Sequence, residues 1–222
     1  ILQMENGGLD ATQQDKLYQQ LALEFRPLKG WKIRLEGNYN TVHYYNHWDV
    51  LPIYYYDQKQ KPIAAAWSGG YAAGKSDVGD SMSKNNYYNG RFFTEYMFTL
   101  NDKHDFKFLA GLDMESNRYT SLGAARADLI SPLVPSLNNA THKDVRPSFS
   151  NTQWATMGAF GRINYAYDSR YLVEFSIRRD GSSRFIGDKT WSTFPSLALG
   201  WNIANEEFFK PLTKTVNTLK LR

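Results

Sequence analysis

The 222-residue sequence contains no cysteine, which excludes disulfides, thiolate catalysis and cysteine-ligated zinc. It has no run of about 18 consecutive apolar residues, so a transmembrane helix is excluded as well. Like charges do not gather into blocks and the net charge is a mild +4, so nothing indicates nucleic-acid binding. The mean hydropathy of −0.55 is hydrophilic. This average still permits a membrane β-barrel, because only alternate residues of its strands face lipid.

Neither end resembles a native terminus. Residues 1–4 lack the basic and apolar regions of a signal peptide, and residues 219–222 stop within an alternating pattern. We therefore expect an internal piece of a longer polypeptide.

A polar turn at residues 165–171 separates two segments in which apolar residues occupy every second position. This period of two on both sides predicts an antiparallel hairpin. Each arm has roughly ten residues or more, and an arm of about 11 residues tilted by about 40° rises about 28 Å, close to the apolar belt of an outer-membrane barrel. The odd positions concerned are Ala155, Met157, Ala159, Gly161 and Ile163 before the turn, and Tyr171, Val173, Phe175 and Ile177 after it.

The same alternation predicts six further strands, at about 16–26, 31–40, 88–100, 105–115, 191–203 and 216–222, and a helical turn at 205–211. Short turns alternate with long irregular stretches at 42–87 and 116–151, which we interpret as extracellular loops opposite short periplasmic turns. The predicted fold class is all-β, an antiparallel transmembrane β-barrel segment of about eight long strands. All of residues 1–222 would belong to one barrel domain.

Charged side chains share the face opposite the apolar one, among them Glu36, Arg91, Lys107, Asp113 and Arg162. An Arg or Lys facing lipid at the bilayer midplane costs about 2–4 kcal/mol, so several of them would cancel the stability of a typical fold. The charged face is therefore expected to line a wet or plugged interior. The strands of a soluble two-sheet sandwich also alternate apolar and polar residues, but they usually have only five or six residues.

An ordered series of motifs carries a family resemblance. It comprises Phe160-Gly-Arg-Ile-Asn-Tyr165, Arg170-Tyr-Leu172, Arg178-Arg179-Asp180-Gly181-Ser182-Ser183-Arg184-Phe185, Trp191, Phe194-Pro-Ser196 and Gly200-Trp201. Together they resemble the SusC/RagA family of TonB-dependent outer-membrane transporters of Bacteroidetes, for which the segment 178–185 is a specific signature. The match is clear from about Trp154 to Arg222, and the first half agrees in pattern more than in motif.

The resemblance implies a 22-stranded barrel with an N-terminal plug, of which this sequence lacks the plug, the TonB box and most strands. It also implies a SusD-like surface lipoprotein as a lid, TonB as the energy source, and import of oligosaccharides or peptides. On this basis we expect a nutrient importer of the outer membrane, with oligosaccharides favoured. A peptide importer and a non-transporting adhesion or surface-binding barrel remain alternatives.

Aromatic residues of the first long loop are candidates for stacking on sugars or contacting the lid. They are Tyr54, Tyr55, Tyr56, Trp67 and Tyr71. An interfacial aromatic belt or packing within the loop explains them equally well. In the signature, Asp180-Gly181 is a turn former, and the alternation places Arg178 inward and Arg179 outward at the rim. Arg179 is then a candidate contact for lipid phosphate.

Metal binding and catalysis find little support. His43, His47 and Asp49 leave a strand rather than sharing a helical face, and Asp57, Asp77 and Asp80 lack EF-hand spacing. The inward carboxylates Glu95, Asp113 and Glu115 would tune the lumen, and no hydrolase or phosphate-loop motif occurs. We expect no enzyme, metal or cofactor.

Overall fold

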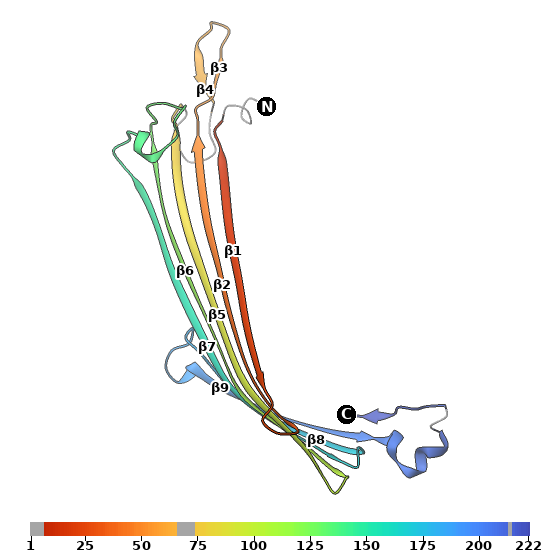
Figure 1. Ribbon diagram of the computed structural model, residues 1–222. Helices are drawn as coiled ribbons and strands as arrows, with labels where there is room; N and C mark the ends of the chain where they lie inside the picture. The colour runs from red at the N-terminus through yellow and green to blue at the C-terminus, as the bar shows by residue number, and fades with distance from the viewer. Residues whose placement is uncertain (1–6, 66–73, 213–214) are drawn as a thin grey trace. The chain divides into compact units, whose positions relative to one another are not determined.

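A computed structural model describes residues 7–65, 74–212 and 215–222. Its main sheet has eight strands in the order β1-β2-β5-β6-β7-β8-β9-β10, so the order along the chain is the order in the sheet (Figure 1). The strands are β1 (Asp10–Phe25), β2 (Trp31–Val50), β5 (Asp77–Leu100), β6 (His104–Ala127), β7 (Arg146–Tyr167), β8 (Tyr171–Ser182), β9 (Trp191–Asn202) and β10 (Lys220–Leu221). A separate hairpin pairs β3 (Tyr54–Tyr56) with β4 (Pro62–Ala64). The predicted all-β class and number of strands are confirmed.

The chain divides into two units, and each is considered by itself. The first comprises Ile1–Leu17, Asn40–Asn86 and Arg118–Gln153; the second comprises Tyr18–Tyr39, Tyr87–Asn117 and Trp154–Arg222. No helix in the described part of the chain is long and apolar enough to cross a membrane.

The apolar face of the second unit is exposed. Along β8, residues at odd positions from Tyr171 to Arg179 are exposed, and those at even positions from Leu172 to Asp180 are half-buried. On neighbouring strands, Phe108 is 37% and Leu199 63% exposed. Among the described residues, buried apolar side chains are few and scattered: Val78, Ala127, Ala140, Ala204 and Phe209. A soluble sandwich would bury its apolar face, so this sheet requires an apolar environment outside itself.

Tight polar turns join the strands of the second unit. At Leu100–Lys103 and again at Tyr167–Arg170, the amide of the fourth residue donates to the carbonyl of the first, at 3.2 and 2.9 Å. Both central residues of each turn have positive φ, between 51° and 55°. This is a type I′ turn, whose twist matches that of the flanking strands, and the Asn, Asp and Ser found there tolerate it.

The irregular stretches predicted at 42–87 and 116–151 are too wide. β2 continues to Val50 and β5 begins at Asp77, while β6 continues to Ala127 and β7 begins at Arg146. Backbone ladders do not require apolar alternation. In the first unit polar side chains pair across the strands instead, as Thr41 Oγ1 does with Asn86 Oδ1 at 2.8 Å. The hydrophobic period therefore ends before the strands do.

The strand predicted at 216–222 is also too long, because the observed strand is limited to Lys220–Leu221. The helical turn expected at 205–211 is present. Three-residue η3 (Ile203–Asn205) and six-residue η4 (Glu207–Leu212) surround Glu206. Two further 3-10 turns are η1 (Leu137–Asn139) and η2 (Gly187–Thr190).

Candidate functional site

The signature segment 178–185 occupies the end of β8 and the start of the following loop, and its first charged residue is Arg178. The Arg178 guanidinium donates to both carboxylate oxygens of Asp113 on β6, at 2.9 and 3.0 Å, and through Nε to Asp180 at 2.8 Å. Asp180 lies opposite Gly158 in the β7–β8 register. A Cβ built on Gly158 would lie 2.6 Å from Arg178 and 2.9 Å from Asp113, so the absent side chain makes room for the cluster.

An aromatic stack supports this ion pair. Phe160 lies opposite Arg178 in the register, and the guanidinium carbon sits 5.6 Å from the Phe160 ring centre. The Phe160 ring in turn covers Gly111 of β6, where a Cβ would approach ring atom Cζ to 2.5 Å. The charged face of β6, β7 and β8 is thus joined by both charge and packing.

The next residue, Arg179, points to the other face. Its guanidinium carbon lies 5.5 Å from the ring centre of Trp191, the first residue of β9. Trp191 lies opposite Gly181 in the register, and a Cβ on Gly181 would come within 2.9 Å of three Trp191 ring atoms. The indole ring of Trp191 therefore packs directly against the backbone of Gly181, in space that a side chain would occupy. The prediction that Gly181 belongs to a turn was wrong, because β8 continues to Ser182.

The remaining signature residues fasten the loop to β7. Ser183 donates its amide to the Ala155 carbonyl at 2.9 Å and accepts the Ala155 amide on Oγ at 2.8 Å. Arg184 stacks on Trp154 with 4.9 Å between the guanidinium carbon and the ring centre. Ser182 Oγ accepts the Arg184 amide at 3.3 Å, and Phe185 is exposed. The signature thus orders both faces of the sheet at the end of β8.

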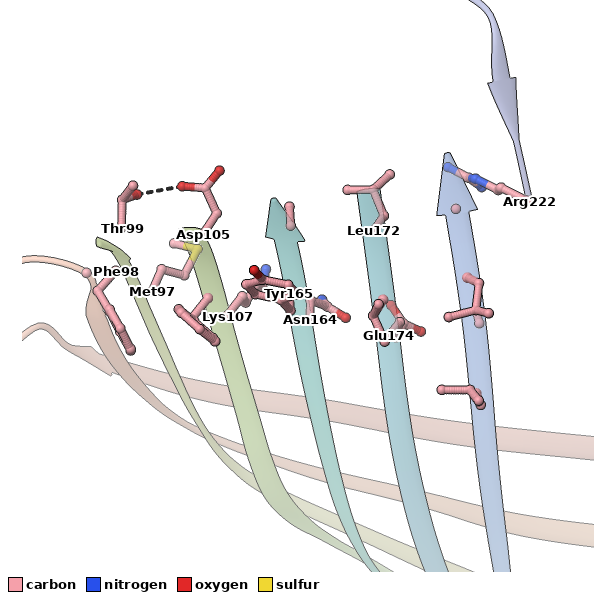
Figure 2. Close-up of a pocket in the computed structure, with 18 of the residues that line it drawn as sticks. Met97, Phe98, Thr99, Asp105, Lys107, Asn164, Tyr165, Leu172, Glu174 and Arg222 are labelled. Atoms are coloured by element: carbon pink, nitrogen blue, oxygen red, sulfur yellow. Dashed lines mark hydrogen bonds between the residues drawn. The ribbon is translucent and has the colours of Figure 1, made fainter. Parts of the chain in front are cut away.

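At the other end of the second unit's strands, a hollow of about 1440 Å³ lies where β5 to β9 approach their short turns. Figure 2 labels Lys107, Asn164 and Glu174 among the residues that line it, beside the hydrogen bond from Thr99 to Asp105 of 2.6 Å. The lining mixes these polar groups with aliphatic and aromatic side chains. The lining offers both polar and apolar contacts, and its residues are not arranged as a catalytic site.

In the first unit, the three consecutive tyrosines Tyr54, Tyr55 and Tyr56 form β3, and all three are exposed. Their hairpin is closed by Asp57, whose Oδ1 accepts the amides of Lys59 and Lys61, both at 2.8 Å. Three members of the predicted aromatic cluster therefore lie on one β-hairpin. Trp67 and Tyr71 lie outside the described residues.

The connection at 128–145, also in the first unit, is held against the strand ends. Arg126 Nε donates to the His142 carbonyl at 2.7 Å, and Lys75 Nζ pairs with Asp128 at 2.8 Å. Ala140 within the connection and Ala127 just before it are both buried. These contacts pack the connection against the strand ends within its unit.

Glu95, His47 and Asp77, which the sequence offered as candidate carboxylates or metal ligands, have structural partners. Glu95 pairs with Lys107 at 2.9 Å and Lys32 at 3.5 Å, so it is not free to work with Asp113 as a catalytic carboxylate. His47 Nδ1 lies 2.8 Å from Asp80, and Asp77 pairs with Arg146. Across residues 7–65, 74–212 and 215–222, no three His, Asp or Glu side chains gather as metal ligands.

Comparison with known proteins decides the family. The family described as "TonB dependent receptor-like, beta-barrel" matches residues 3–214, nearly the whole chain. The chain belongs to the TonB-dependent receptor β-barrel family. Proteins of this family, such as SusC, are outer-membrane β-barrel proteins, which accounts for the exposed apolar face. The SusC/RagA resemblance inferred from the motifs is confirmed.

Relatives of the TonB-dependent receptor family share sequence over part of the chain. A TonB-dependent receptor of Formosa agariphila is 36% identical over 137 residues, which is 61% of this chain and 13% of the relative. The TonB-dependent receptor SusC of Bacteroides thetaiotaomicron is 56% identical over 63 residues, 28% of this chain and 6% of SusC. Both relatives are TonB-dependent receptors, and the chain spans only a small part of their length.

Solved structures agree on the fold. The RagAB peptide transporter aligns with a TM-score of 0.78 at 18% identity, covering 90% of this chain and 21% of that one. The same RagAB importer in its "open-open" state aligns equally well, at 19% identity. The strands described here thus correspond to part of a larger barrel wall.

The sequence did not indicate which residues contact the signature, although Asp113 was already placed on the charged face. Asp113 and Gly111 are remote in sequence, and no local signal joins them to Arg178. Trp191 was named as a motif residue, but its seat on Gly181 depends on the β8–β9 register. The alternation in the sequence shows which face of the sheet each residue lies on, but it does not show which residue lies opposite on the next strand.

Proposed function

We propose that this chain is a section of the wall and outer loops of a TonB-dependent importer of nutrients, with oligosaccharides as cargo. The observation that carries the proposal is the difference in chemical character between the two faces of the second unit. One face exposes apolar residues such as Phe108 and Leu199. The other holds charged residues in pairs, such as Arg178 with Asp113 and Glu95 with Lys107. Such a wall separates lipid from a wetted bore.

The choice of oligosaccharide rests on the tyrosine hairpin. Tyr54, Tyr55 and Tyr56 present flat rings with a hydroxyl on an exposed element. Rings of this kind stack against the apolar faces of sugars while the hydroxyl forms hydrogen bonds. The loops at 51–76 and 128–145 would face the outside of the cell, and TonB would supply the energy through a region not included in this chain. A SusD-like lipoprotein is the proposed lid.

The fold similarity to the RagAB peptide transporter favours a second candidate, import of peptides. Exposed tyrosines also bind extended peptides, so the hairpin is compatible with both cargoes. A third candidate, a non-transporting surface-binding barrel, would retain the loops and dispense with TonB.

The proposal is tested in the full-length receptor, in cells that depend on it for growth on oligosaccharide. Replacing Tyr54, Tyr55 and Tyr56 together by alanine is expected to reduce uptake of labelled oligosaccharide about tenfold or more, since each stacking contact contributes about 0.5–1.5 kcal/mol. Lys59→Ala, on the same hairpin, is the matched control and should retain uptake.

Three results would redirect the assignment. Uptake of oligopeptides that falls in the triple variant, with no uptake of sugar by the parent, favours the peptide importer. Binding that persists without any uptake, and is unaffected by deletion of TonB, favours the surface-binding barrel. Full oligosaccharide uptake by the triple variant removes the hairpin from the cargo path.

A further inference from the structure

The unusual charge on the apolar face of the second unit is Arg179. Below it on the same face of β8 lie Val173, Phe175 and Ile177, all exposed and all apolar. Its cross-strand neighbours are Ala159 on β7 and Thr193 on β9. Within the described part of the chain, no carboxylate forms an ion pair with Arg179, whereas the adjacent Arg178 has two. A charge without a counter-ion next to an apolar band is energetically costly, so it favours an anionic partner.

The geometry of Arg179 leaves it ready for such a partner. The Trp191 ring, 5.5 Å from its guanidinium carbon, provides a platform on one side. A guanidinium that rests on an aromatic ring still has its N–H donors directed outward in its own plane, in a fork that matches two phosphate oxygens. Trp191 is itself held in place over Gly181. The donor group is thus positioned before any ligand arrives.

The position along the strand indicates where the ligand comes from. Arg179 follows the last apolar residue of the exposed band, Ile177, and precedes the end of β8 at Ser182. Tryptophan is enriched where a membrane protein crosses the boundary between acyl chains and headgroups. Arg179 and Trp191 therefore lie at the level of headgroups, on the side of the sheet that faces lipid.

We propose that Arg179 and Trp191 form a binding site for the phosphate of an outer-membrane lipid. The guanidinium edge holds two phosphate oxygens, and the indole ring and Ile177 contact the glycerol or sugar region and the first methylenes of the lipid. The site depends only on the outer-membrane location of the barrel, so it stands whatever cargo the receptor carries.

A matched pair of variants tests the proposal in the full-length receptor. Arg184 also stacks on a tryptophan, Trp154, but Trp154 shares the even positions of β7 with Phe160 on the charged face. Retention of phosphatidylglycerol per barrel is measured by native mass spectrometry after stepwise delipidation, for the parent, Arg179→Gln and Arg184→Gln. We expect retention to weaken about fivefold in Arg179→Gln, the loss typical of one basic side chain at a membrane surface. Arg184→Gln should behave like the parent.

Two further arms separate the ligand chemistry. Digalactosyldiacylglycerol, which has no phosphate, should be retained equally by the parent and Arg179→Gln. Excess inorganic phosphate should not release phosphatidylglycerol from the parent, and release by free phosphate would overturn the assignment to lipid. Equal retention of phosphatidylglycerol by the parent and Arg179→Gln would overturn the site itself.

A second variant guards against misfolding of the first. Thr193→Glu keeps Arg179 and places a carboxylate opposite it in the β8–β9 register. This internal counter-ion should occupy the guanidinium and reduce phosphatidylglycerol retention as strongly as Arg179→Gln. Heat-modifiable migration in gels verifies that each barrel is folded. Parent-like retention by folded Thr193→Glu would contradict the proposal.

Discussion

Arg178 donates to both carboxylate oxygens of Asp113, a residue 65 positions earlier in the chain, at 2.9 and 3.0 Å. The pair spans β7, because Asp113 is on β6 and Arg178 on β8. Phe160 of β7 packs beneath the guanidinium, so three strands meet at this contact. Both hydrogen bonds leave the same guanidinium nitrogen, Nη2, so the ion pair connects β6 to β8 at one point across β7.

The first prediction concerns this ion pair. Arg178→Gln and Asp113→Asn are each expected to lower the free energy of unfolding of the full-length receptor by about 1–2 kcal/mol, the lower part of the range for charged hydrogen bonds, because the Arg178 side chain is 43% exposed and screened by water. The double variant should lose little more than either single one. Urea unfolding in detergent measures the coupling, and strictly additive losses would show that the two side chains act independently.

The second prediction concerns Gly111. A Cβ there would lie 2.7 Å from the Phe92 carbonyl oxygen and 2.8 Å from Phe93 Cβ, besides pressing on the Phe160 ring. Because a backbone atom cannot move aside as a side-chain end does, Gly111→Ala should destabilise the receptor by about 1–3 kcal/mol. Gly161→Ala is the matched control on the neighbouring strand, since its Cβ would find nothing closer than 3.9 Å. Equal urea midpoints for the two variants would contradict the packing described.

Much of this fold could be predicted from the sequence because strands alternate strictly. The odd positions of β8, from Val173 to Ile177, showed their face without any structural knowledge, and the Asn101-Asp102 turn showed where a strand reverses. Charge then distinguished the lumen from the lipid side, because several unpaired charges facing hydrocarbon would be too costly for a stable fold.

The rest was beyond the sequence for two physical reasons. Strand ends such as Val50 and Asp77 are held by backbone ladders that continue where side chains turn polar, so hydropathy no longer reports them. Partnerships such as Arg178 with Asp113 depend on the registers of two successive hairpins, and each register depends on how its turn closes. The signature motif and the opposite faces of Arg178 and Arg179 were visible in the sequence, but the packing of their partners against Gly158 and Gly181 became clear only from the structure.

The third prediction concerns pH and the short connection after β9. Trp201 Nε1 donates to Glu206 at 3.0 Å, Tyr171 donates as well, and Arg170 pairs with it at 3.1 Å; together they hold the pKa of Glu206 below its usual value of 4.5. A carboxylate with a lowered folded-state pKa stabilises the fold fully above its ordinary pKa, and this stabilisation is lost as pH falls through the lowered value.

Glu206→Gln should therefore lower the unfolding temperature of the receptor at neutral pH and flatten its decline below about pH 4.5. Glu207→Gln is the matched control, because Glu207 is exposed and its ion pair is with the exposed Lys210. Thermal scans across this pH range measure both. A decline in Glu206→Gln that parallels the parent would show that another carboxylate governs acid stability.

The fourth prediction concerns the tyrosine hairpin, whose tip is organised by Asp57. Asp57→Ala removes the acceptor for the Lys59 and Lys61 amides, and each lost bond should favour local opening by about 1 kcal/mol, or roughly fivefold. Lys61 precedes Pro62 and is resistant to trypsin, so cleavage after Lys59 reports the opening and should accelerate by about tenfold or more in the variant. Cleavage after Lys189, which lies in η2, provides the internal control and should not change.

Because Asp57 has no ring, a loss of oligosaccharide uptake in Asp57→Ala would be attributable to disorder of Tyr54–Tyr56. Unchanged cleavage after Lys59 would mean instead that the hairpin is held by its β3–β4 ladder alone.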